Sequence, residues 1–503
     1  MTGPQVPRPS APDAQALTKQ QLEELEEQLS KTDNLRRIEA ERRQKTEAEL
    51  DALRVEIDAI RQANAAATDP HDYNEADTRR LLIDVLLREA GWDTSAPKAT
   101  EVEVQGMPWQ KPGDTGRGFI DYVLWGDNGK PLALVEAKRT SKSPEVGQHQ
   151  AKLYADCLQQ QYEQRPVIFY SNGYETWLWD DRRYPPREVL GFLKKEELER
   201  LIFRRSHQKR LSAAPINEAI AGKGRPYQKE AIRRITETFE EQLIRRALLV
   251  MATGTGKTRT AIALVDLMKR CNWAQRVLFL ADRNALLTQA YRAFQSNLPT
   301  VTPVDLTRTK AIDGANVILS TYKTILNAIN RINHEERLFG VGHFDLVIVD
   351  EAHRSIYKKY GEIFDYFDAL LVGLTATPRA EVDRDTYRIF QLQQGVPTFA
   401  YELNDAVKDG HLVPARGVDV PFRFLRTGVK YSDLTPEEQL EYEEKFRNEE
   451  TGELPTEINA AALNQWLFNI STVDQALELL MERGLKVNSG DRLGKTIIFA
   501  RNH

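Results

Sequence analysis

A glycine-rich turn between an apolar strand and a helix constrains this chain more than any other feature. The strand is ALLV (247–250) and the turn is MATGTGKT (251–258). The helical segment TAIALVDLM (260–268) follows. In such a turn, backbone N–H groups point at phosphate and the helix N-terminus adds partial positive charge. Lys257 then suits the β- and γ-phosphates of a nucleotide, and Thr258 suits its Mg²⁺. Met251 stands where the strict pattern has glycine, so the match is imperfect.

A second apolar strand, LVIVDEAH (346–353), ends in two adjacent carboxylates. Asp350 at the strand tip suits a Mg²⁺ contact through water, because hard cations favour oxygen ligands. Glu351 suits the general base that orients the attacking water. DEAH alone could be an ordinary solvated strand end, but the two segments together predict a site for ATP hydrolysis.

From Arg225 onward, apolar strands alternate with helices. This order predicts an α/β fold with a parallel sheet covered by helices on both faces. Lys and Arg number 69 against 74 Asp and Glu, so any nucleic-acid contact is expected to be a local patch. Two cysteines, Cys157 and Cys271, are too few for a disulfide framework or a cysteine zinc site. Without a long apolar run or a signal-peptide pattern, we expect a cytoplasmic protein with no membrane partner.

The order of short motifs resembles superfamily 2 helicases and translocases. The matching segments are RPYQ (225–228), MATGTGKT (251–258), VLFLADRNALL (277–287), STY (320–322), DEAH (350–353) and TATP (375–378). The resemblance implies a RecA-like motor domain that binds ATP, with Gln228 at the adenine. The residues it assigns to ATP are Arg225, Gln228, Thr253, Gly254, Thr255, Gly256, Lys257, Thr258, Asp350 and His353, with Thr258 and Asp350 at its Mg²⁺.

The same resemblance assigns further residues to movement and to DNA. It implies that Thr375 and Thr377 couple hydrolysis to strand movement, and that Asp282, Arg283 and Thr321 lie near the nucleic-acid backbone. For Asp282, an ordinary strand end remains the alternative. KTIIFARNH (495–503) resembles the first strand of a second motor domain, whose later motifs and ATP-site arginine are not in these residues. A first motor domain by itself is expected to bind ATP but to hydrolyse it poorly.

Upstream, a predicted hairpin carries a second group of charged residues. The strand FIDYVLW contains Asp121, DNGK forms the turn, and PLALVEAKR returns. Glu136 and Lys138 are two residues apart, so in a strand both side chains leave one face, and Asp121 on the neighbouring strand can converge with them. Two carboxylates with a backbone carbonyl can hold one or two Mg²⁺ ions, and the ammonium can orient water, which predicts metal-assisted phosphodiester hydrolysis. The alternative is a solvated strand end.

These residues resemble the PD-(D/E)xK nucleases, although Ile120 stands where that family has proline. The resemblance implies that Asp121, Glu136 and Lys138 are catalytic and that Glu75 is a further metal ligand. Gln150 and Tyr154 lie at i and i+4 and share one helix face. That pair accompanies the nuclease signature in enzymes fused to superfamily 2 motors, which strengthens the interpretation.

A nuclease domain followed directly by such a motor resembles the restriction (R) subunit of type I restriction-modification enzymes. The resemblance implies translocation and cutting of double-stranded DNA with ATP and Mg²⁺, beside methylase and specificity subunits, with S-adenosylmethionine used only by the methylase. Three alternatives remain: a helicase-nuclease of another defence or repair system, a non-cutting ATP-dependent remodeller, and a coiled-coil interaction protein with a vestigial motor. The expected layout is a disordered tail (1–16), a long helix or coiled coil (17–66), the nuclease domain (67–205), a linker (206–224), the first motor domain (225–405) and the start of a second (406–503).

Overall fold

A computed structural model describes much of the chain between Thr78 and Ile497. The described residues are 78–108, 116–139, 142–309, 311–330, 332–333, 336–352, 355–377, 379–382, 384–414, 429–433, 439–440, 442–443, 457–458 and 470–497. The expected tail and long helix, Glu75, His353 and the end of the KTIIFARNH segment lie outside them. The chain divides into two units, residues 1–412 and 413–503. Within the described residues, no helix combines the length and apolarity needed to cross a membrane.

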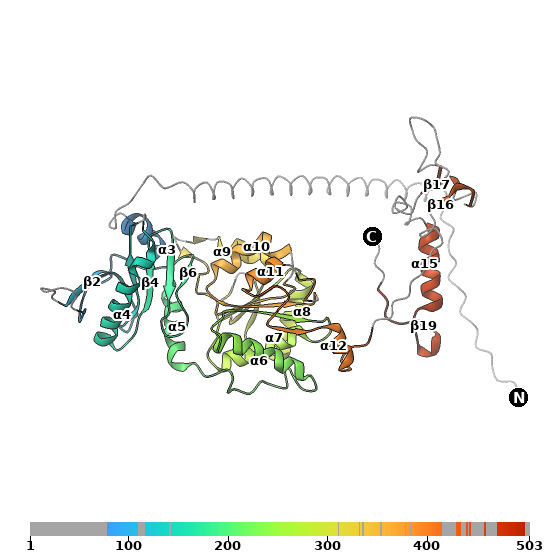
Figure 1. Ribbon diagram of the computed structural model, residues 1–503, viewed down its shortest axis with the longest axis horizontal. Coiled ribbons are helices and arrows are strands. Elements are labelled where there is room, and N and C mark those ends of the chain that lie inside the picture. The colour runs from blue at the N-terminus through green and yellow to red at the C-terminus, as the bar shows by residue number, and fades with distance from the viewer. Residues whose placement is uncertain are drawn as a thin grey trace. The chain divides into compact units, whose positions relative to one another are not determined.

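The first part of unit 1 is a six-stranded mixed sheet in the order β1-β2-β3-β4-β5-β6 (Figure 1). Only β3 and β4 pair in parallel, and the other neighbours are antiparallel. The elements are η1 (Arg79–Ile83), α3 (Asp84–Glu89), β1 (Thr100–Gln105), β2 (Arg117–Trp125), β3 (Pro131–Ala137), η2 (Pro144–Gly147), α4 (Gln148–Tyr162), β4 (Val167–Ser171), β5 (Thr176–Trp179), β6 (Arg187–Val189) and α5 (Lys195–His207).

The predicted hairpin of β2 and β3 is present, with Gly129 in its turn at φ 69°. Every residue of β3 is buried, because helices cover both faces of the sheet. Leu134 belongs to the core under α4, whereas Val135 belongs to the core shared with α3 and α5. Alternate residues of one strand therefore serve two different cores.

The second part of unit 1 is a seven-stranded sheet in the order β15-β7-β14-β13-β8-β10-β9. All its pairs are parallel, which confirms the predicted sheet. Its elements are α6 (Pro226–Glu240), β7 (Arg246–Met251), α7 (Lys257–Arg270), β8 (Val277–Ala281), α8 (Asn284–Asn297), β9 (Pro303–Asp305), β10 (Val317–Thr321), α9 (Tyr322–Ile329), β13 (Leu346–Val349), α10 (Ser355–Tyr366), β14 (Leu370–Thr375), α11 (Arg384–Ile389), β15 (Phe399–Tyr401) and α12 (Leu403–Lys408), with the short pair β11 (Ile332–Asn333) and β12 (Glu336–Arg337) after α9.

Helices cover both faces of this sheet, as the sequence predicted. Ala247, Leu249 and Met251 of β7 pack in the core with α6, α7 and α8. Leu248 and Val250 point to the opposite core, which contains α9 and α10. Figure 1 shows α6 and α7 below the sheet and α9 and α10 above it. Because all strands run the same way, the loops after β7, β8, β10, β13 and β14 gather at one edge.

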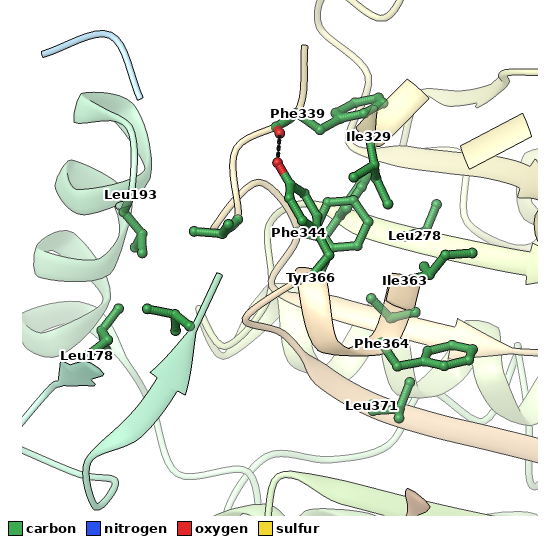
Figure 2. Close-up of a cluster of buried hydrophobic side chains, with 14 of the residues drawn as sticks. Leu178, Leu193, Leu278, Ile329, Phe339, Phe344, Ile363, Phe364, Tyr366 and Leu371 are labelled. Atoms are coloured by element: carbon green, nitrogen blue, oxygen red, sulfur yellow. Dashed lines mark hydrogen bonds between the residues drawn. The ribbon is translucent and has the colours of Figure 1, made fainter. Parts of the chain in front are cut away.

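The two parts of unit 1 pack against each other, so their contact extends beyond the expected linker at 206–224. Leu178 and Leu193 of the first part share a buried core with Phe344 of the second (Figure 2). Leu211 and Ile220, in the segment expected to be a linker, are buried in the core under α6 and α7. The isolated Leu and Ile of that segment therefore belong to a core, although the small residues around them predict a linker.

Unit 2 is described only in pieces. They are β16 (Val429–Lys430) paired with β17 (Glu457–Ile458), the helix α15 (Ile470–Arg483), and β18 (Lys486–Val487) paired with β19 (Arg492–Leu493), with the short turns η3 (Tyr431–Asp433) and η5 (Asn488–Gly490).

Candidate active sites

The glycine-rich turn lies between β7 and α7, and its backbone requires glycine. Gly254 and Gly256 have φ of 87° and 89°, a region that glycine enters without strain. A Cβ on Gly256 would lie 2.5 Å from Nε2 of Gln228. The turn is held by its buried Thr255, whose carbonyl accepts hydrogen bonds from the Tyr227 hydroxyl (2.9 Å) and the Gln228 amide (2.8 Å).

Gln228 is almost fully buried, and its amide is already used on both sides. Nε2 donates to Thr255, and Oε1 accepts from the N–H of Gly222 at 3.0 Å. Arg225 also reaches the Thr255 carbonyl, at 3.4 Å. Gln228, expected at the adenine, and Arg225 therefore both brace the turn. The Gln228 amide keeps a second N–H hydrogen and a second oxygen lone pair for a contact with adenine.

Tyr227 and Tyr401 are site residues that sequence reasoning missed. The Tyr227 ring stacks on Tyr401 of β15, with centroids 3.9 Å apart. The stack packs β15 beside the turn, at the edge of the sheet next to β7. Tyr227 lies inside the RPYQ segment, which the sequence already assigns to the ATP site. Nothing in the sequence indicates that Tyr401 on β15 is its stacking partner.

The two carboxylates of DEAH lie where β13 ends. The N–H of Asp350 donates to Leu280 (2.8 Å) and the N–H of Ala352 donates to Leu374 (2.8 Å), so the segment is fixed to both neighbouring strands. Between them Glu351 has φ 52°, a left-handed conformation that costs a non-glycine residue about 1 kcal/mol. Its Oε1 lies 3.7 Å from Nζ of Lys257. The structure thus brings Lys257, Asp350 and Glu351 together from separate segments.

Asp350 is a buried carboxylate in this group. Burial is the main cause that raises its pKa to about 6, the adjacent Glu351 adds to the shift, and Lys257 opposes it. A cation beside Asp350 would favour the ionised form. Hard oxygen donors and a raised pKa fit a Mg²⁺ contact, and the Thr258 side chain is partly exposed in the first turn of α7.

The remaining motor residues divide into buried and exposed ones. Thr375 ends β14, is fully buried, and its hydroxyl accepts the N–H of Thr377 at 3.1 Å. Thr321 caps α9 by accepting the N–H of Thr324 at 3.3 Å. Asp282 and Arg283 are exposed and form an ion pair at 3.3 Å. Thr321 and Thr377 are partly exposed, so Asp282 and Arg283 are the most exposed residues of this set.

The hairpin residues also come together. Nζ of Lys138 lies 2.6 Å from Oε1 of Glu136, and both side chains are largely buried. Oδ2 of Asp121 accepts the N–H of Ala137, between them, at 2.7 Å. Gln150 donates to the Tyr154 hydroxyl at 2.7 Å. Burial is the main cause that raises the pKa of Tyr154, and the negative charges of Glu136 and Asp121 add to the shift.

Arg79 and Gly147 are two residues of this cluster that sequence reasoning missed. Nη1 of Arg79, on η1, lies 3.0 Å from Oδ1 of Asp121. A Cβ on Gly147 would meet side-chain atoms of both Glu136 and Lys138 at 3.0 Å, so only glycine lets α4 approach this closely. Among the described residues no group of three His, Cys, Asp or Glu side chains is arranged to hold a metal. Asp121 and Glu136 are the two carboxylates available there, and both are oxygen donors that suit Mg²⁺.

Comparison with protein families gives two matches that cover the two clusters. Residues 109–187 match the family "Type I restriction enzyme R protein N terminus", and residues 222–380 match "Type III restriction enzyme, res subunit". Asp121, Glu136, Lys138, Gln150 and Tyr154 fall in the first match, and the motor residues from Arg225 to Thr377 fall in the second.

Similar curated proteins come from Escherichia coli. The type I restriction enzyme EcoAI endonuclease subunit is 28% identical over 437 residues, which cover 81% of this chain and 52% of that protein. The EcoKI endonuclease subunit of strain K12 is 28% identical over 446 residues, which cover 72% of this chain and 37% of that protein. The chain thus spans about half the length of the first relative, and less of the second.

Among solved structures, a fragment of an HsdR subunit of a type I restriction enzyme from Vibrio vulnificus YJ016 is 27% identical, covers 67% of this chain and 61% of that one, and has a TM-score of 0.28. The sequence matches identify the relatives of this chain, and the structural similarity adds nothing to them. Both family regions stand in the order expected of one subunit, and relatives of that subunit align along most of the chain. The chain is similar, along most of its length, to the R (endonuclease) subunits of type I restriction-modification enzymes.

Proposed function

We propose that this chain carries the nuclease and first motor parts of an R subunit that translocates duplex DNA with ATP and cuts unmodified DNA with Mg²⁺. One observation carries the proposal. Two clusters of carboxylates, each beside a lysine, lie on two separate sheets of one chain, and each falls in its own family match.

In the motor cluster, Lys257 binds and neutralises nucleotide phosphate at the glycine-rich turn. Asp350 and Thr258 would hold Mg²⁺, which supplies charge neutralisation on the phosphates. Glu351 orients the attacking water, and its fixed backbone places the carboxylate 3.7 Å from Lys257. Ala352 donates to the Leu374 carbonyl of β14, the residue before the buried Thr375, so this segment is bonded to the strand that carries Thr375.

In the nuclease cluster, Asp121 and Glu136 would hold Mg²⁺, which supplies Lewis-acid activation at the scissile phosphate. Lys138 is held by Glu136 at 2.6 Å, where its ammonium can orient water or stabilise developing negative charge. Gln150 and Tyr154 position the site from α4. Glu75 stays a proposed additional ligand.

The partners of this subunit are proposed from the family. Methylase and specificity subunits would form the complex, the specificity subunit would read the DNA sequence, and S-adenosylmethionine would bind only to the methylase. Asp282, Arg283 and Thr321 are the proposed contacts with the DNA backbone. No base-reading role is proposed for this chain.

Cleavage of supercoiled plasmid by the assembled complex tests the function. We expect cutting to require ATP, Mg²⁺ and at least one unmethylated recognition site. Cutting that needs neither the methylase nor the specificity subunit would favour the helicase-nuclease of another system. ATP turnover without cutting under any condition would favour the remodeller.

A further inference from the structure

Two cavities lie where the nuclease part packs on the motor sheet, and their charges differ. The larger cavity, of about 950 Å³, is lined by four arginines and four carboxylates, so the charges of its lining cancel. The smaller, of about 610 Å³, is lined by seven arginines and five carboxylates. Both have the size of small-molecule sites, but only in the smaller do arginines outnumber carboxylates along the lining. One of its arginines, Arg165, is already paired with Asp156 and Asp181, which do not line the cavity.

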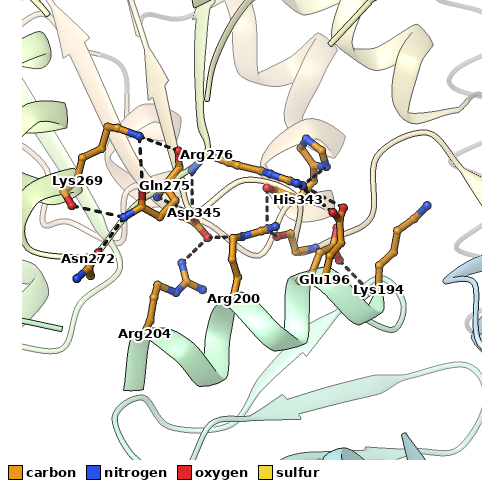
Figure 3. Close-up of polar contacts among 12 residues, drawn as sticks. Lys194, Glu196, Arg200, Arg204, Lys269, Asn272, Gln275, Arg276, His343 and Asp345 are labelled. Carbon is orange, nitrogen blue, oxygen red and sulfur yellow. Dashed lines mark hydrogen bonds and ion pairs between the residues drawn. The ribbon is translucent and has the colours of Figure 1, made fainter. Parts of the chain in front are cut away.

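Several of these arginines contact two aspartates that lie at the amino ends of motor strands. Asp368, before β14, takes a bidentate pair from Arg187 at 2.6 Å for each bond and a further bond from Arg245 at 2.8 Å. Asp345, before β13, contacts Arg204 and lies 3.7 Å from Arg200 (Figure 3). Each carboxylate therefore faces two guanidinium groups.

A third carboxyl does not restore the balance. Glu197 on α5 is buried, and burial raises its pKa to about 7, so it is partly protonated at neutral pH. Arg245 stays charged, since burial and the neighbouring Arg187 lower its pKa only to about 10. Arg183 also lines the cavity, bonds Gln208 at 2.8 Å and lies over the Trp273 ring at 3.7 Å.

Guanidinium hydrogens remain available beside this excess. Within the described part of the chain, Nη1 of Arg187 and Nε of Arg183 are buried without a hydrogen-bond partner. Arginine cannot give up its proton to relieve this situation. A buried donor without an acceptor is unfavourable, and an anion with several oxygens is the complement that arginine forks fit best.

We propose that this cavity binds a small phosphate-bearing anion. Arg183, Arg187 and Arg204 come from the nuclease part, and Arg245 comes from the motor sheet. One anion between them joins the two parts through shared hydrogen bonds. The site is at the amino edge of the motor sheet, opposite the edge that carries Lys257, so it is separate from the ATP site.

Thermal unfolding of the 503-residue chain tests the proposal, with Lys257→Ala as the parent so that phosphate binding at the glycine-rich turn is removed. Inorganic phosphate at saturation is expected to raise the unfolding midpoint by roughly 3 °C over potassium chloride of equal ionic strength. Adding Arg245→Gln to this parent is expected to weaken the phosphate effect about tenfold. Without phosphate the same variant should unfold no earlier than its parent, because Asp368 keeps the bidentate pair with Arg187.

Two further variants keep the test decisive. Arg183→Gln removes charge from a half-buried residue with a single neutral hydrogen-bond partner, so it should fold and should also weaken the phosphate effect. Arg292→Gln, an exposed change on α8, is the matched control and should leave the phosphate effect unchanged.

Pyrophosphate and AMP identify the source of the anion. AMP binding at least about tenfold tighter than phosphate would indicate a nucleotide, with its base beside Trp273 or Tyr184. Equal binding would indicate free phosphate. The proposal is overturned if phosphate acts no differently from chloride, or if its effect persists undiminished in both cavity variants.

Discussion

The nuclease and motor clusters each hold two carboxylates and one lysine, but they are held together differently. In the nuclease cluster Glu136 and Lys138 belong to one strand and contact at 2.6 Å. In the motor cluster Lys257 comes from the start of α7 and Glu351 from the end of β13, and they stay 3.7 Å apart. Local spacing fixes the first pair, whereas the second exists only because parallel strands end at one edge.

The difference bears on electrostatics as well. Glu136 has a cation in direct contact, whereas Asp350 is buried beside another carboxylate, so its pKa rises to about 6, mainly through burial. The nuclease cluster is therefore compensated within the chain. The motor cluster depends on a cation that a ligand would bring.

The largest expected effect is on the motor. Lys257→Ala should lower ATP turnover and translocation of the assembled enzyme by at least about a thousandfold, because an ammonium at the phosphates is lost in a site that relies on electrostatic stabilisation. The fold should persist, since the Lys257 ammonium makes only a long bond to the Met251 carbonyl at 3.4 Å and an ion pair with Glu351 at 3.7 Å. Translocation on a DNA substrate, followed with circular dichroism of the same sample, checks this. Wild-type turnover would remove Lys257 from the site.

The next effect separates the clusters. Glu136→Ala, Lys138→Ala and Asp121→Ala should each lower DNA cleavage by at least about a hundredfold while ATP turnover stays near wild type. Glu136 faces α4, whereas the motor packs against the core shared with α3 and α5, so the loss should not be transmitted.

Plasmid linearisation and ATP turnover, measured on one preparation, decide this point. Normal cleavage by Glu136→Ala would reduce the cluster to a structural hairpin. Loss of ATP turnover as well would show that the packed contact between the two parts couples their activities.

A smaller effect is expected from the α4 pair. Gln150→Ala should lower cleavage about tenfold, because the Gln150 amide fixes the Tyr154 hydroxyl and takes no part in bond breaking. Gln150→Glu, which keeps the size but not the donor, should resemble it. If either variant abolishes cleavage as fully as Glu136→Ala, Gln150 acts at the reacting phosphate.

These sites also show what a sequence can predict. The hairpin cluster and the alternation that builds the motor sheet follow from residue spacing, which is a local property. The ion pair of Arg79 with Asp121, the stack of Tyr227 on Tyr401 and the arginines around Asp368 join residues far apart in the chain. Their geometry depends on how helices and sheets pack, and no spacing rule contains it. Leu211 and Ile220 stand among small and polar neighbours that predict a linker, although both side chains are packed in the core.

The last expected effect is on stability instead of activity, and it has opposite signs at the two clusters. Asp350 has a pKa of about 6 in the folded chain against the ordinary aspartate value of 3.8. Between these values the folded state binds more protons than the unfolded state, so stability falls as pH rises through the window. Above it the full cost, roughly 2–3 kcal/mol, is present. Asp350→Asn should therefore stabilise the fold at pH 8, measured in EDTA without nucleotide, and the gain should shrink as pH falls toward 4.

Glu136→Gln is the matched change at the nuclease cluster, and it should act the other way. It removes the carboxylate that contacts the largely buried Lys138 at 2.6 Å, so it should cost roughly 1–3 kcal/mol at pH 8. Urea unfolding of both variants beside the parent measures the two signs directly. If both changes stabilise, the nuclease pair is not compensated within the chain, and its lysine, like that of the motor, is held for a ligand. If both destabilise, the burial cost at Asp350 is already offset by its own bonds, and the contrast between the two clusters is confined to their geometry.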